Sequence, residues 1–264
     1  MKIGFIGGGN MGTAMLGGIL RKEIYKKEEI IVSDLSPERL SYIKEKLGVE
    51  TTSDNKEVAK AADIIVLSIK PQFYEEVLTE VRDAFTPEKI VVGIAPGKTL
   101  SWLEEKCAAP VKIFRLMPNT PAQVGEGMTA VCPNGRATEE DVKRICEITD
   151  SFGKTEVVPE RLLDAVGAVS GSSPAYVFMF IEAMADAAVA QGMARKQAYA
   201  FAAQAVLGSA KMVLETGMHP GELKDMVCSP AGTTIEGVRT LEKMGFRSAV
   251  YEALNACAEK GKTL

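Results

Sequence analysis

Histidine is almost absent from this chain. His219 is the only one among 264 residues, and because it precedes Pro-Gly we expect it in a loop or as a helix cap. A Ser-His-Asp triad is therefore possible only through this residue, and the sequence has no G-x-S-x-G motif. No cluster of His, Cys, Asp and Glu suggests a metal site. These absences favour a reaction in which a bound cofactor carries the chemistry, because such a reaction needs no strong base from the protein.

The sequence also lacks a basic excess, a cysteine pair and a long apolar run. Its net charge of −4 offers a nucleic-acid backbone no obvious positive surface. The five cysteines are an odd number without a Cys-x-x-Cys spacing, which indicates reduced thiols in a cytoplasmic protein. The richest apolar stretch, residues 175–190, is interrupted by Glu182 and Asp186, and a bilayer span needs roughly 20 residues. We therefore expect no membrane span, and no signal peptide before a strand that begins at Lys2.

The first half of the chain alternates strand-like and helical stretches. Short apolar runs predict strands at residues 2–6, 29–34, 63–68, 89–93, 111–115 and 128–132, with helical patterns between most of them. A helix at 138–151 and a strand at 153–158 complete this half. The alternation predicts an α/β fold, in which a Rossmann-type, doubly wound and mostly parallel sheet spans residues 1–159.

From residue 160 to 264 the pattern predicts an all-α domain. Helices are expected at 160–169, 173–191, 194–215, 220–227, 230–243 and 246–260. Helix 173–191 is apolar on nearly every side, which predicts burial all round. We expect a second copy of the chain to cover it in a two-fold homodimer, and the alternative is a self-contained bundle.

A glycine-rich segment follows the first predicted strand. Residues 7–12, Gly-Gly-Gly-Asn-Met-Gly, fit the G-x-G-x-x-G pattern between a strand and a helix, which predicts a dinucleotide site. Gly7 would permit the tight turn, and Gly9 would let the backbone approach a pyrophosphate. Gly12 would let the helix lie close to the strand.

The residues alone lean only slightly towards one coenzyme. Asp34 ends the second strand, where an acidic residue usually binds the ribose 2′-hydroxyl of NAD. Ser36 and Arg39 lie beside it, and Arg39 would pair with the 2′-phosphate of NADP if the loop turned Asp34 away. The segments 68–71 and 94–97 follow two further strands and should also line the dinucleotide. In the first of them, Lys70 is either a phosphate contact or a surface charge.

Two segments of small residues predict a site for a small anion. In the first, Ser229 is expected to cap a helix and Pro230 to be its first residue, so that residues 231–234 offer backbone N–H groups and hydroxyls to a carboxylate. The second, Ser170-Gly171-Ser172-Ser173-Pro174, is interpreted as another free helix N-terminus. The loop 115–121 should reach toward the same cleft.

The sequence resembles the Δ1-pyrroline-5-carboxylate reductase family over its whole length. The matching segments are IGFIGGGNMG, ADIIVLSIKP, RLMPNTPA, VSGSSPAYVFMFIEAMADAA and QAVLGSAKMVLETGMHPGELKDMVCSPAGTTIEGVRTLE, in the family's order. Ala231 stands where glycine is usual. The resemblance implies NAD(P)H-dependent reduction of Δ1-pyrroline-5-carboxylate to L-proline, the last step of proline biosynthesis. It also implies a Rossmann-type domain followed by an all-α dimerisation domain.

The resemblance further implies the coenzyme, the assembly and the site residues. The family mostly prefers NADPH, although some members use NADH. This preference outweighs the indication of NAD from Asp34. Protomers pair through their helical domains, some members assemble five such dimers into a decamer, and the substrate lies between one subunit's nucleotide domain and its partner's helices. Thr234 matches the catalytic threonine whose hydroxyl faces the ring nitrogen. The substrate positions are matched by Glu160, Thr233 and Thr234, to which the residues add Ser170, Gly171, Ser172 and Gly232. Cofactor positions are matched by Ile6, Gly7, Gly8, Gly9, Asn10, Met11, Asn55, Ser68, Ile69, Lys70, Pro71, Ala95, Asp225 and Met226.

Two other functions remain open on the residues. A β-hydroxyacid dehydrogenase would share the two-domain plan, but it needs a general base, typically lysine, and the Ser-Gly-Ser-Ser helix has none in its first turns. A non-catalytic nucleotide sensor would keep the glycine fingerprint without a second anion site.

Overall fold

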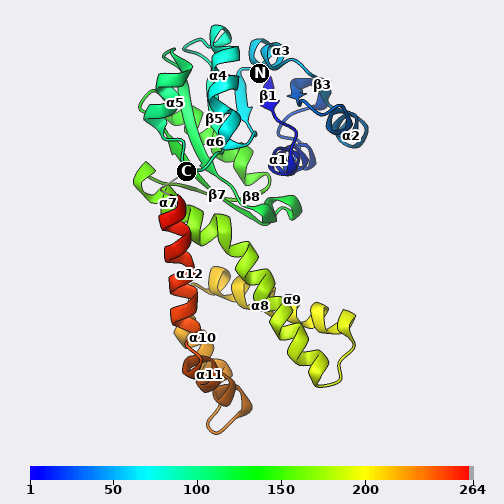
Figure 1. Cartoon of the computed structure of the whole chain (residues 1–264), viewed down its shortest axis with the longest axis vertical. Helices are drawn as coiled ribbons and strands as arrows, with labels where there is room; N and C mark the ends of the chain where they lie inside the picture. The colour runs from blue at the N-terminus through cyan, green and yellow to red at the C-terminus, as the bar shows by residue number, and fades with distance from the viewer. Residues whose placement is uncertain (262–264) are drawn as a thin grey trace. The chain divides into compact units, whose positions relative to one another are not determined.

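The computed structural model describes residues 1–261, which divide into two compact units. The first is Met1–Ser172 with the end of the chain from Cys257 onward, and the second is Ser173–Ala256. The first unit holds the sheet, and the described part of the second consists of helices and the turns between them. Figure 1 shows the elements of both units with their labels.

The sheet of the first unit has eight strands in the described residues, in the order β3-β2-β1-β4-β5-β6-β7-β8. All neighbouring pairs are parallel except β6 and β7, which are antiparallel. This confirms the predicted doubly wound, mostly parallel sheet. The short edge strand β3 was not predicted, because its Glu-Thr-Thr sequence has no apolar run. The strands are β1 Ile3–Ile6, β2 Ile30–Ser33, β3 Glu50–Thr52, β4 Ile64–Leu67, β5 Ile90–Gly93, β6 Lys112–Met117, β7 Gly127–Pro133 and β8 Gly153–Val157.

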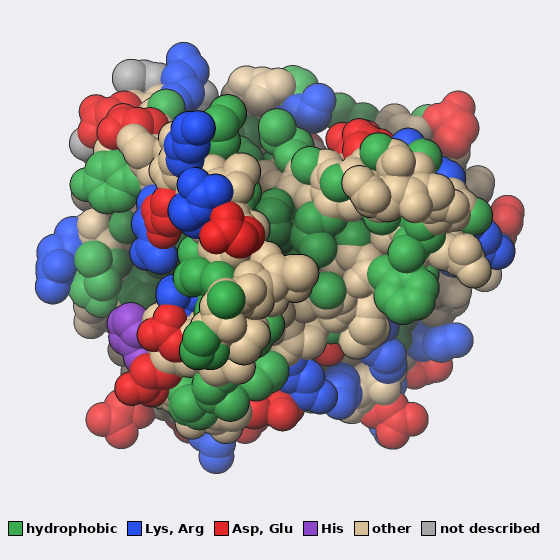
Figure 2. Space-filling model, turned by 90° about the horizontal axis from the view of Figure 1, so that it is seen from below, with side chains coloured by type: hydrophobic (Ala, Val, Ile, Leu, Met, Phe, Trp, Pro, Cys, Tyr) green, Lys and Arg blue, Asp and Glu red, His purple; other side chains and the backbone are tan. Residues whose placement is uncertain are grey.

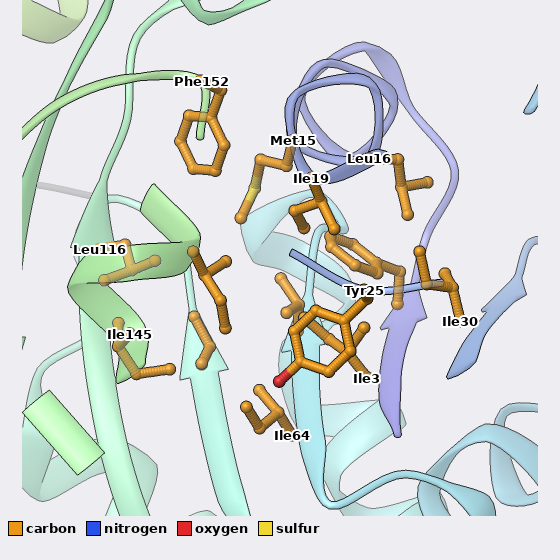
Figure 3. Close-up of a cluster of buried hydrophobic side chains, with 14 of the residues drawn as sticks. Ile3, Met15, Leu16, Ile19, Tyr25, Ile30, Ile64, Leu116, Ile145 and Phe152 are labelled. Carbon is orange, nitrogen blue, oxygen red and sulfur yellow. The ribbon is translucent and has the colours of Figure 1, made fainter. Parts of the chain in front are cut away.

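Helices cover both faces of this sheet. Side chains on successive residues of a strand point to opposite faces, so Ile64 packs in one buried cluster and Ile65 in the other. One cluster holds side chains of α1, α2 and α6, and Figure 3 shows Met15 and Ile19 of α1 near Ile3 and Ile145. The other holds side chains of α3, α4 and α5. The helices are α1 Asn10–Arg21, α2 Pro37–Leu47, α3 Asn55–Ala61, α4 Tyr74–Val81, α5 Leu100–Cys107 and α6 Glu139–Asp150.

Local sequence sets where these helices begin. Ser36 caps α2 by accepting a hydrogen bond from the Arg39 N–H, and Pro37 takes the first helical position, as predicted. Thr138 and Asp141 form a reciprocal capping box at the start of α6. The described residues of the first unit also hold five 3₁₀ turns: Lys27–Glu29, Pro71–Phe73 (η2), Arg82–Ala84, Thr120–Val124 and Glu160–Leu162.

The chain continues from the sheet into one long helical run. The turn Glu160–Leu162 leads into α7 (Leu163–Val166), a π-helix at Gly167–Ser172 and α8 (Ser173–Ala190). The predicted free helix N-terminus at Ser170–Pro174 is therefore wrong. A proline this far inside a helix has no N–H to donate and crowds the preceding turn, and the widened π turn before it relieves that conflict.

The sequence predicted no membrane span, but the helical run Glu160–Ala190 meets the length and composition criterion for one. Its 31 residues are long and apolar enough, by length and composition, to cross a membrane, because the helix is continuous with residues before 173. Length and composition are all that this criterion measures, and core helices of other proteins also meet it.

The second unit exposes much of its apolar surface. Its helices are α8, α9 (Arg195–Thr216), α10 (Pro220–Val227), α11 (Thr233–Lys243) and α12 (Phe246–Gly261), whose end belongs to the first unit. In its described residues the buried hydrophobic side chains are three alanines, Ala185, Ala198 and Ala202. Large side chains such as Phe201 and Leu214 are 67% and 83% exposed. Figure 2 shows many hydrophobic side chains at the molecular surface.

Candidate functional site

The predicted nucleotide residues of the first unit gather at one edge of the sheet. The segments after β1, β2, β4 and β5 all leave the carboxyl ends of parallel strands, which is the edge where open α/β sheets bind ligands. This edge brings together the segments at Ile6–Met11, Asp34–Ser36, Ser68–Pro71 and Ile94–Gly97.

The three glycines of the fingerprint have different surroundings. Gly7 has a φ of +101°, and a Cβ there would lie 2.6 Å from the Ser68 carbonyl oxygen. A Cβ on Gly12 would lie 2.7 Å from the Gly7 carbonyl oxygen, so α1 packs directly against the loop. These observations confirm the roles predicted for Gly7 and Gly12. A Cβ on Gly9 would meet no atom within 4 Å, which leaves the space that a close pyrophosphate requires.

Gly9 is also the N-cap of α1, and no side chain makes a cap hydrogen bond there. The first N–H groups of a helix have no partner within the helix, and together with the helix dipole they favour an anion. The residues at this end of the sheet therefore fit a dinucleotide.

Both neighbouring strands hold the glycine loop in place. From the β2 side, the Ser33 carbonyl accepts from the Gly7 N–H at 2.8 Å. The Asp34 carboxylate accepts from the Gly8 N–H at 2.7 Å. From the β4 side, the Ser68 hydroxyl donates to the Gly7 carbonyl at 2.6 Å. The loop conformation is thus fixed by the folded sheet.

Asp34 and Arg39 both turn toward this loop. The Asp34 carboxylate accepts a second hydrogen bond, from the Ser36 N–H at 2.9 Å. The Arg39 guanidinium donates to the Gly8 carbonyl at 2.6 and 2.9 Å and to the Thr13 hydroxyl at 2.6 Å. Arg39 and Thr13 line a cavity of about 340 Å³ with residues that include Asn10, Tyr42 and Gln123. Two backbone donors thus offset the negative charge of Asp34, and Arg39 places a positive charge beside the cavity.

Two further predicted cofactor residues are placed by neighbouring elements. Asn55, the first residue of α3, accepts from the Ser33 hydroxyl at 2.7 Å and donates to Glu80 at 2.8 Å. Lys70 precedes the 3₁₀ turn η2 and is its N-cap in extended conformation. Both residues therefore stand next to the same sheet edge.

Glu160 is engaged inside the first unit. Its Oε1 accepts from the Arg115 guanidinium at 2.6 Å and from the Leu100 N–H at 2.7 Å. The Arg115 side chain is only 7% exposed. Both side chains line a cavity of about 480 Å³ together with Thr99, Arg161 and other residues. This predicted substrate residue therefore fixes the start of α5 as well as facing a cavity.

Residues 115–117 of the predicted loop 115–121 are the end of strand β6, and the residues that follow contact the predicted serine segment. The Asn119 side-chain amide donates to the Ser170 carbonyl at 3.1 Å and to the Ser170 hydroxyl at 3.3 Å, while its Oδ1 accepts from the Met128 N–H at 2.8 Å. The Ser172 hydroxyl accepts from the Cys257 thiol at 3.0 Å. The segment 170–172 is π-helical, and its hydroxyls have partners within the first unit.

The second unit holds the other predicted anion site. The helix α11 begins at Thr233 with Gly232 as its N-cap, so the predicted helix start at Ser229-Pro230 is wrong. Residues 229–232 form a turn instead, in which the Gly232 N–H donates to the Ser229 carbonyl at 3.0 Å. Ala231 has a φ of +55°. A proline at the second position followed by positive φ at the third is typical of a type II turn, which accounts for the family's usual glycine there.

The start of α11 is an open helix N-terminus, as the sequence predicted, but it lies three residues later than expected. Gly232 makes no side-chain cap hydrogen bond, and Thr233 and Thr234 form the first turn. Asp225 and Met226 lie near the end of α10, on the other side of the turn, and Met226 is 66% exposed. His219 caps α10 by accepting from the Gly221 N–H at 3.0 Å, which confirms its predicted capping role.

Two polar residues at the sheet edge were missed in the sequence. Thr13 donates to the Gly8 and Gly9 carbonyls at 3.1 and 2.8 Å. Its position directly after the fingerprint, one helical turn from Gly9, was the available signal. Tyr74 links the ends of β4 and β5 through its hydroxyl. No local sequence pattern predicts this contact. Within residues 1–261, no group of three or more His, Cys, Asp and Glu side chains is arranged to hold a metal.

Known proteins resemble the chain over its full length. Residues 160–264 match the family model described as pyrroline-5-carboxylate reductase dimerisation. Residues 2–97 match a model described as NADP oxidoreductase, coenzyme F420-dependent. Pyrroline-5-carboxylate reductase of Escherichia coli strain K12 is 53% identical over 100% of this chain and 98% of its own length. The enzyme of that name from Methanosarcina acetivorans is 46% identical over 100% and 97%.

A solved structure is also similar to this chain over its full length. The crystal structure of Plasmodium falciparum pyrroline carboxylate reductase with NADP bound superposes with a TM-score of 0.91 at 35% identity, covering 100% of this chain and 97% of that one.

Proposed function

The chain belongs to the pyrroline-5-carboxylate reductase family and reduces the C=N bond of Δ1-pyrroline-5-carboxylate with a nicotinamide cofactor, and we propose that NADPH is its preferred reductant. The product is L-proline, so the reaction is the last step of proline biosynthesis. The main support for the cofactor site is the open N-terminus of α1 at Gly9. Ser68 and Asp34 hold the glycine loop before it from both sides. When bound, the reduced nicotinamide supplies a hydride to the imine carbon.

Charge near the cavity beside α1 supports the preference for NADPH. A 2′-phosphate needs a positive group and is repelled by a free carboxylate. Arg39 lines this cavity, and the Asp34 carboxylate is held against the Gly8 and Ser36 N–H groups. We propose that Ser36 and Arg39 face the adenosine ribose, and that Ile6–Met11, Asn55, Ser68–Pro71 and Ala95 hold the rest of the dinucleotide. Parallel titrations with NADPH and NADH in the presence of the imine decide the preference. A kcat/KM for NADH equal to or above that for NADPH would overturn it.

For the substrate, we propose that the start of α11 holds the carboxylate. The unpartnered first N–H groups of a helix favour an anion there. The helix opens at Gly232 and Thr233; the Gly232 N–H already bonds the Ser229 carbonyl, so we propose that the N–H groups from Thr233 onward bind the carboxylate, with Glu160 and residues Ser170–Ser172 as further substrate contacts. The Thr234 hydroxyl is then free to hydrogen-bond the ring nitrogen as it becomes an amine. Asp225 and Met226 are proposed to contact the cofactor from α10.

The role of Thr234 can be tested by removing its hydroxyl. Losing one such contact costs about 1–3 kcal/mol when the buried partner stays unpaired, so Thr234→Ala should lower kcat/KM roughly 10- to 100-fold. Thr240→Ala is a matched control, because Thr240 lies on the same helix and its hydroxyl bonds the Glu236 carbonyl. Equal kcat/KM in Thr234→Ala and the unmodified enzyme would contradict the assignment.

The match to a dimerisation domain points to oligomerisation, and we propose a homodimer through residues 160–264. In the second unit only alanines are buried among the hydrophobic side chains of the described residues, while Phe178, Met179 and Leu214 are each more than 60% exposed. A helical unit without a core of large side chains needs another surface to cover it. Sedimentation over a concentration series tests this proposal. A folded monomer at micromolar concentration would exclude the dimer. A species of ten chains would indicate that five dimers assemble into a decamer.

We also propose the domain division 1–159 and 160–264, which places the whole dimerisation match in the second domain, and a cytoplasmic location. The five cysteines are free, as the thiols of a protein in a reducing compartment are.

A further inference from the structure

Tyr74 occupies a position between the ends of two neighbouring strands. It is the first residue of α4, and its side chain is fully buried. Its hydroxyl donates to the Leu67 carbonyl at 2.6 Å and accepts from the Ile94 and Ala95 N–H groups at 2.9 and 3.1 Å. A hydroxyl has one donor and two acceptor lone pairs, so these three contacts use all of its capacity.

The hydrogen bonds of the Tyr74 hydroxyl lie just beyond the last paired residues of β4 and β5. The parallel ladder between β4 and β5 ends with the pair Leu67–Gly93. Beyond that pair, the chain diverges into the segments Ser68–Pro71 and Ile94–Gly97. The Tyr74 hydroxyl joins the last residue of β4 to the first two residues after β5. It therefore extends the connection between the strands by one further step and fixes how far apart the two segments begin.

The protonation state of this group keeps the three contacts in one arrangement. Burial raises the pKa of Tyr74 above its ordinary value, and this outweighs the Ile94 and Ala95 N–H groups and nearby Arg115, which lower it. The hydroxyl consequently retains its proton and always donates to the Leu67 carbonyl.

The segment after β5 is also held at its far end. The Leu100 N–H donates to Glu160 at 2.7 Å, and the buried Arg115 holds the same carboxylate oxygen. Residues 95–99 thus span between two fixed points, Tyr74 and Glu160. A change at either point should move this segment without unfolding the sheet below it.

We propose that Tyr74 is a positioning residue for hydride transfer, because its hydroxyl sets the separation of the segments Ser68–Pro71 and Ile94–Gly97, which would flank the nicotinamide ring. This inference rests on the proposed cofactor site. Hydride transfer requires the donor and acceptor carbons in close alignment, and a misplacement of about 1 Å can cost roughly 100-fold in rate. The glycine loop that holds the pyrophosphate does not contact Tyr74 in any of these hydrogen bonds.

The test is Tyr74→Phe, which keeps the ring in the core and removes only the hydroxyl. We expect kcat to fall roughly 10- to 100-fold, while the dissociation constant of NADPH, measured by fluorescence quenching, changes less than about threefold. A merely destabilising substitution would lower the active fraction, and would then reduce cofactor-binding capacity and activity together.

Tyr25→Phe is the matched control. Tyr25 is also a buried tyrosine of the first unit, but it packs in the other cluster, beside Arg144 (Figure 3). It should change the unfolding temperature without changing kcat or the KM values. Wild-type kcat and KM in Tyr74→Phe would overturn the proposal, and so would equal losses in the two variants.

Amide hydrogen exchange of the unmodified enzyme gives a second measurement that does not depend on a variant. The Ile94 and Ala95 amides should be protected with or without NADPH, whereas exchange as fast as that of Gly97 in the same loop would overturn the inference. If the unmodified enzyme bound NADPH but did not oxidise it on addition of the imine, the proposed function would fail. The exchange result would still report on the Tyr74 contacts.

Discussion

Gly12 in helix α1 allows a sharp test of how the nucleotide loop is built. A Cβ at this position would lie 2.7 Å from the Gly7 carbonyl oxygen and 2.9 Å from the Ser68 hydroxyl oxygen. The first of these atoms is backbone and the second is already hydrogen-bonded to Gly7, so neither can move away easily. Gly12→Ala should therefore push α1 from the loop.

The magnitude follows from two opposing effects. Overpacking by one methyl group costs about 1–3 kcal/mol, and replacing glycine by alanine inside a helix returns up to about 1 kcal/mol. With the full return the net destabilisation should reach about 2 kcal/mol at most, which lowers the unfolding temperature by up to roughly 8 °C in a unit of this size. The displaced helix start should also weaken NADPH binding by about tenfold, equivalent to about 1.4 kcal/mol.

Thermal unfolding and NADPH titration of the purified variant measure both effects. Gly17→Ala is the control for stability, since Gly17 is in the same helix and a Cβ there would meet no atom within 4 Å. It should keep or raise the unfolding temperature. If Gly12→Ala unfolded at the temperature of Gly17→Ala and bound NADPH normally, close packing of α1 on the loop would not be the reason for this glycine.

Two further predictions concern the first unit. Partial burial by itself would raise the pKa of Asp141, but hydrogen bonds from Lys112 and Thr138 outweigh it and lower the pKa. The charged side chain therefore stabilises the fold above the unfolded pKa near 4, and this contribution is lost as pH falls through the lower folded pKa. Asp141→Asn should cost about 1–3 kcal/mol at pH 7 and progressively less as the pH falls below 4. Burial raises the pKa of Cys107 to about 12, so iodoacetamide at pH 7.5 should leave it unmodified until the protein is unfolded.

Urea unfolding at several pH values checks the first of these, with Lys112→Met as the partner variant. A loss in Asp141→Asn that stays the same from pH 7 down to the lowest pH at which the protein remains folded would show that the charge contributes nothing. Mass spectrometry of alkylated peptides checks the second, and rapid labelling of native Cys107 would refute it.

The sheet was predictable because its central strands are buried on both faces. Such strands read as continuous apolar runs, as in Ile64–Leu67 and Ile90–Gly93, and the glycine fingerprint marked where the first one ends. The edge strand Glu50–Thr52 escaped prediction because it is polar and partly exposed. Its pairing with β2 depends on the neighbouring strand and not on its own sequence.

The two helix starts in the second half were misplaced for a related reason. Proline has the same φ at the first position of a helix and at the second position of a turn, so Ser229-Pro230 is compatible with both. The positive φ of Ala231 selects the turn, and alanine gives no sign of it. At Pro174 the preceding π-helix lets the helix continue, and that adjustment is also invisible in the sequence.

Contacts between residues far apart in the sequence explain why the remaining roles in the site were not predicted. Tyr74 reaches residues 94 and 95, and Glu160 reaches residue 100, so their roles arise only when the strands are assembled. Local patterns identified the backbone at the carboxyl edge of the sheet, where we propose that the cofactor binds. The side chains that hold this backbone in place required the fold.

The exposed apolar helices of the second unit raise the question of what covers them. Helix α8 is long and apolar enough for lipid when joined to residues 160–172, yet it carries Asp186, which pairs with Arg195 at the start of α9. Charged groups are costly at hydrocarbon depth, and both side chains of this pair are substantially exposed. Alanine-rich helices allow another helix to approach closely, and a protein surface can place polar groups opposite the ion pair. The second copy of the chain proposed above would therefore satisfy both the apolar and the charged parts of this surface, which lipid would not.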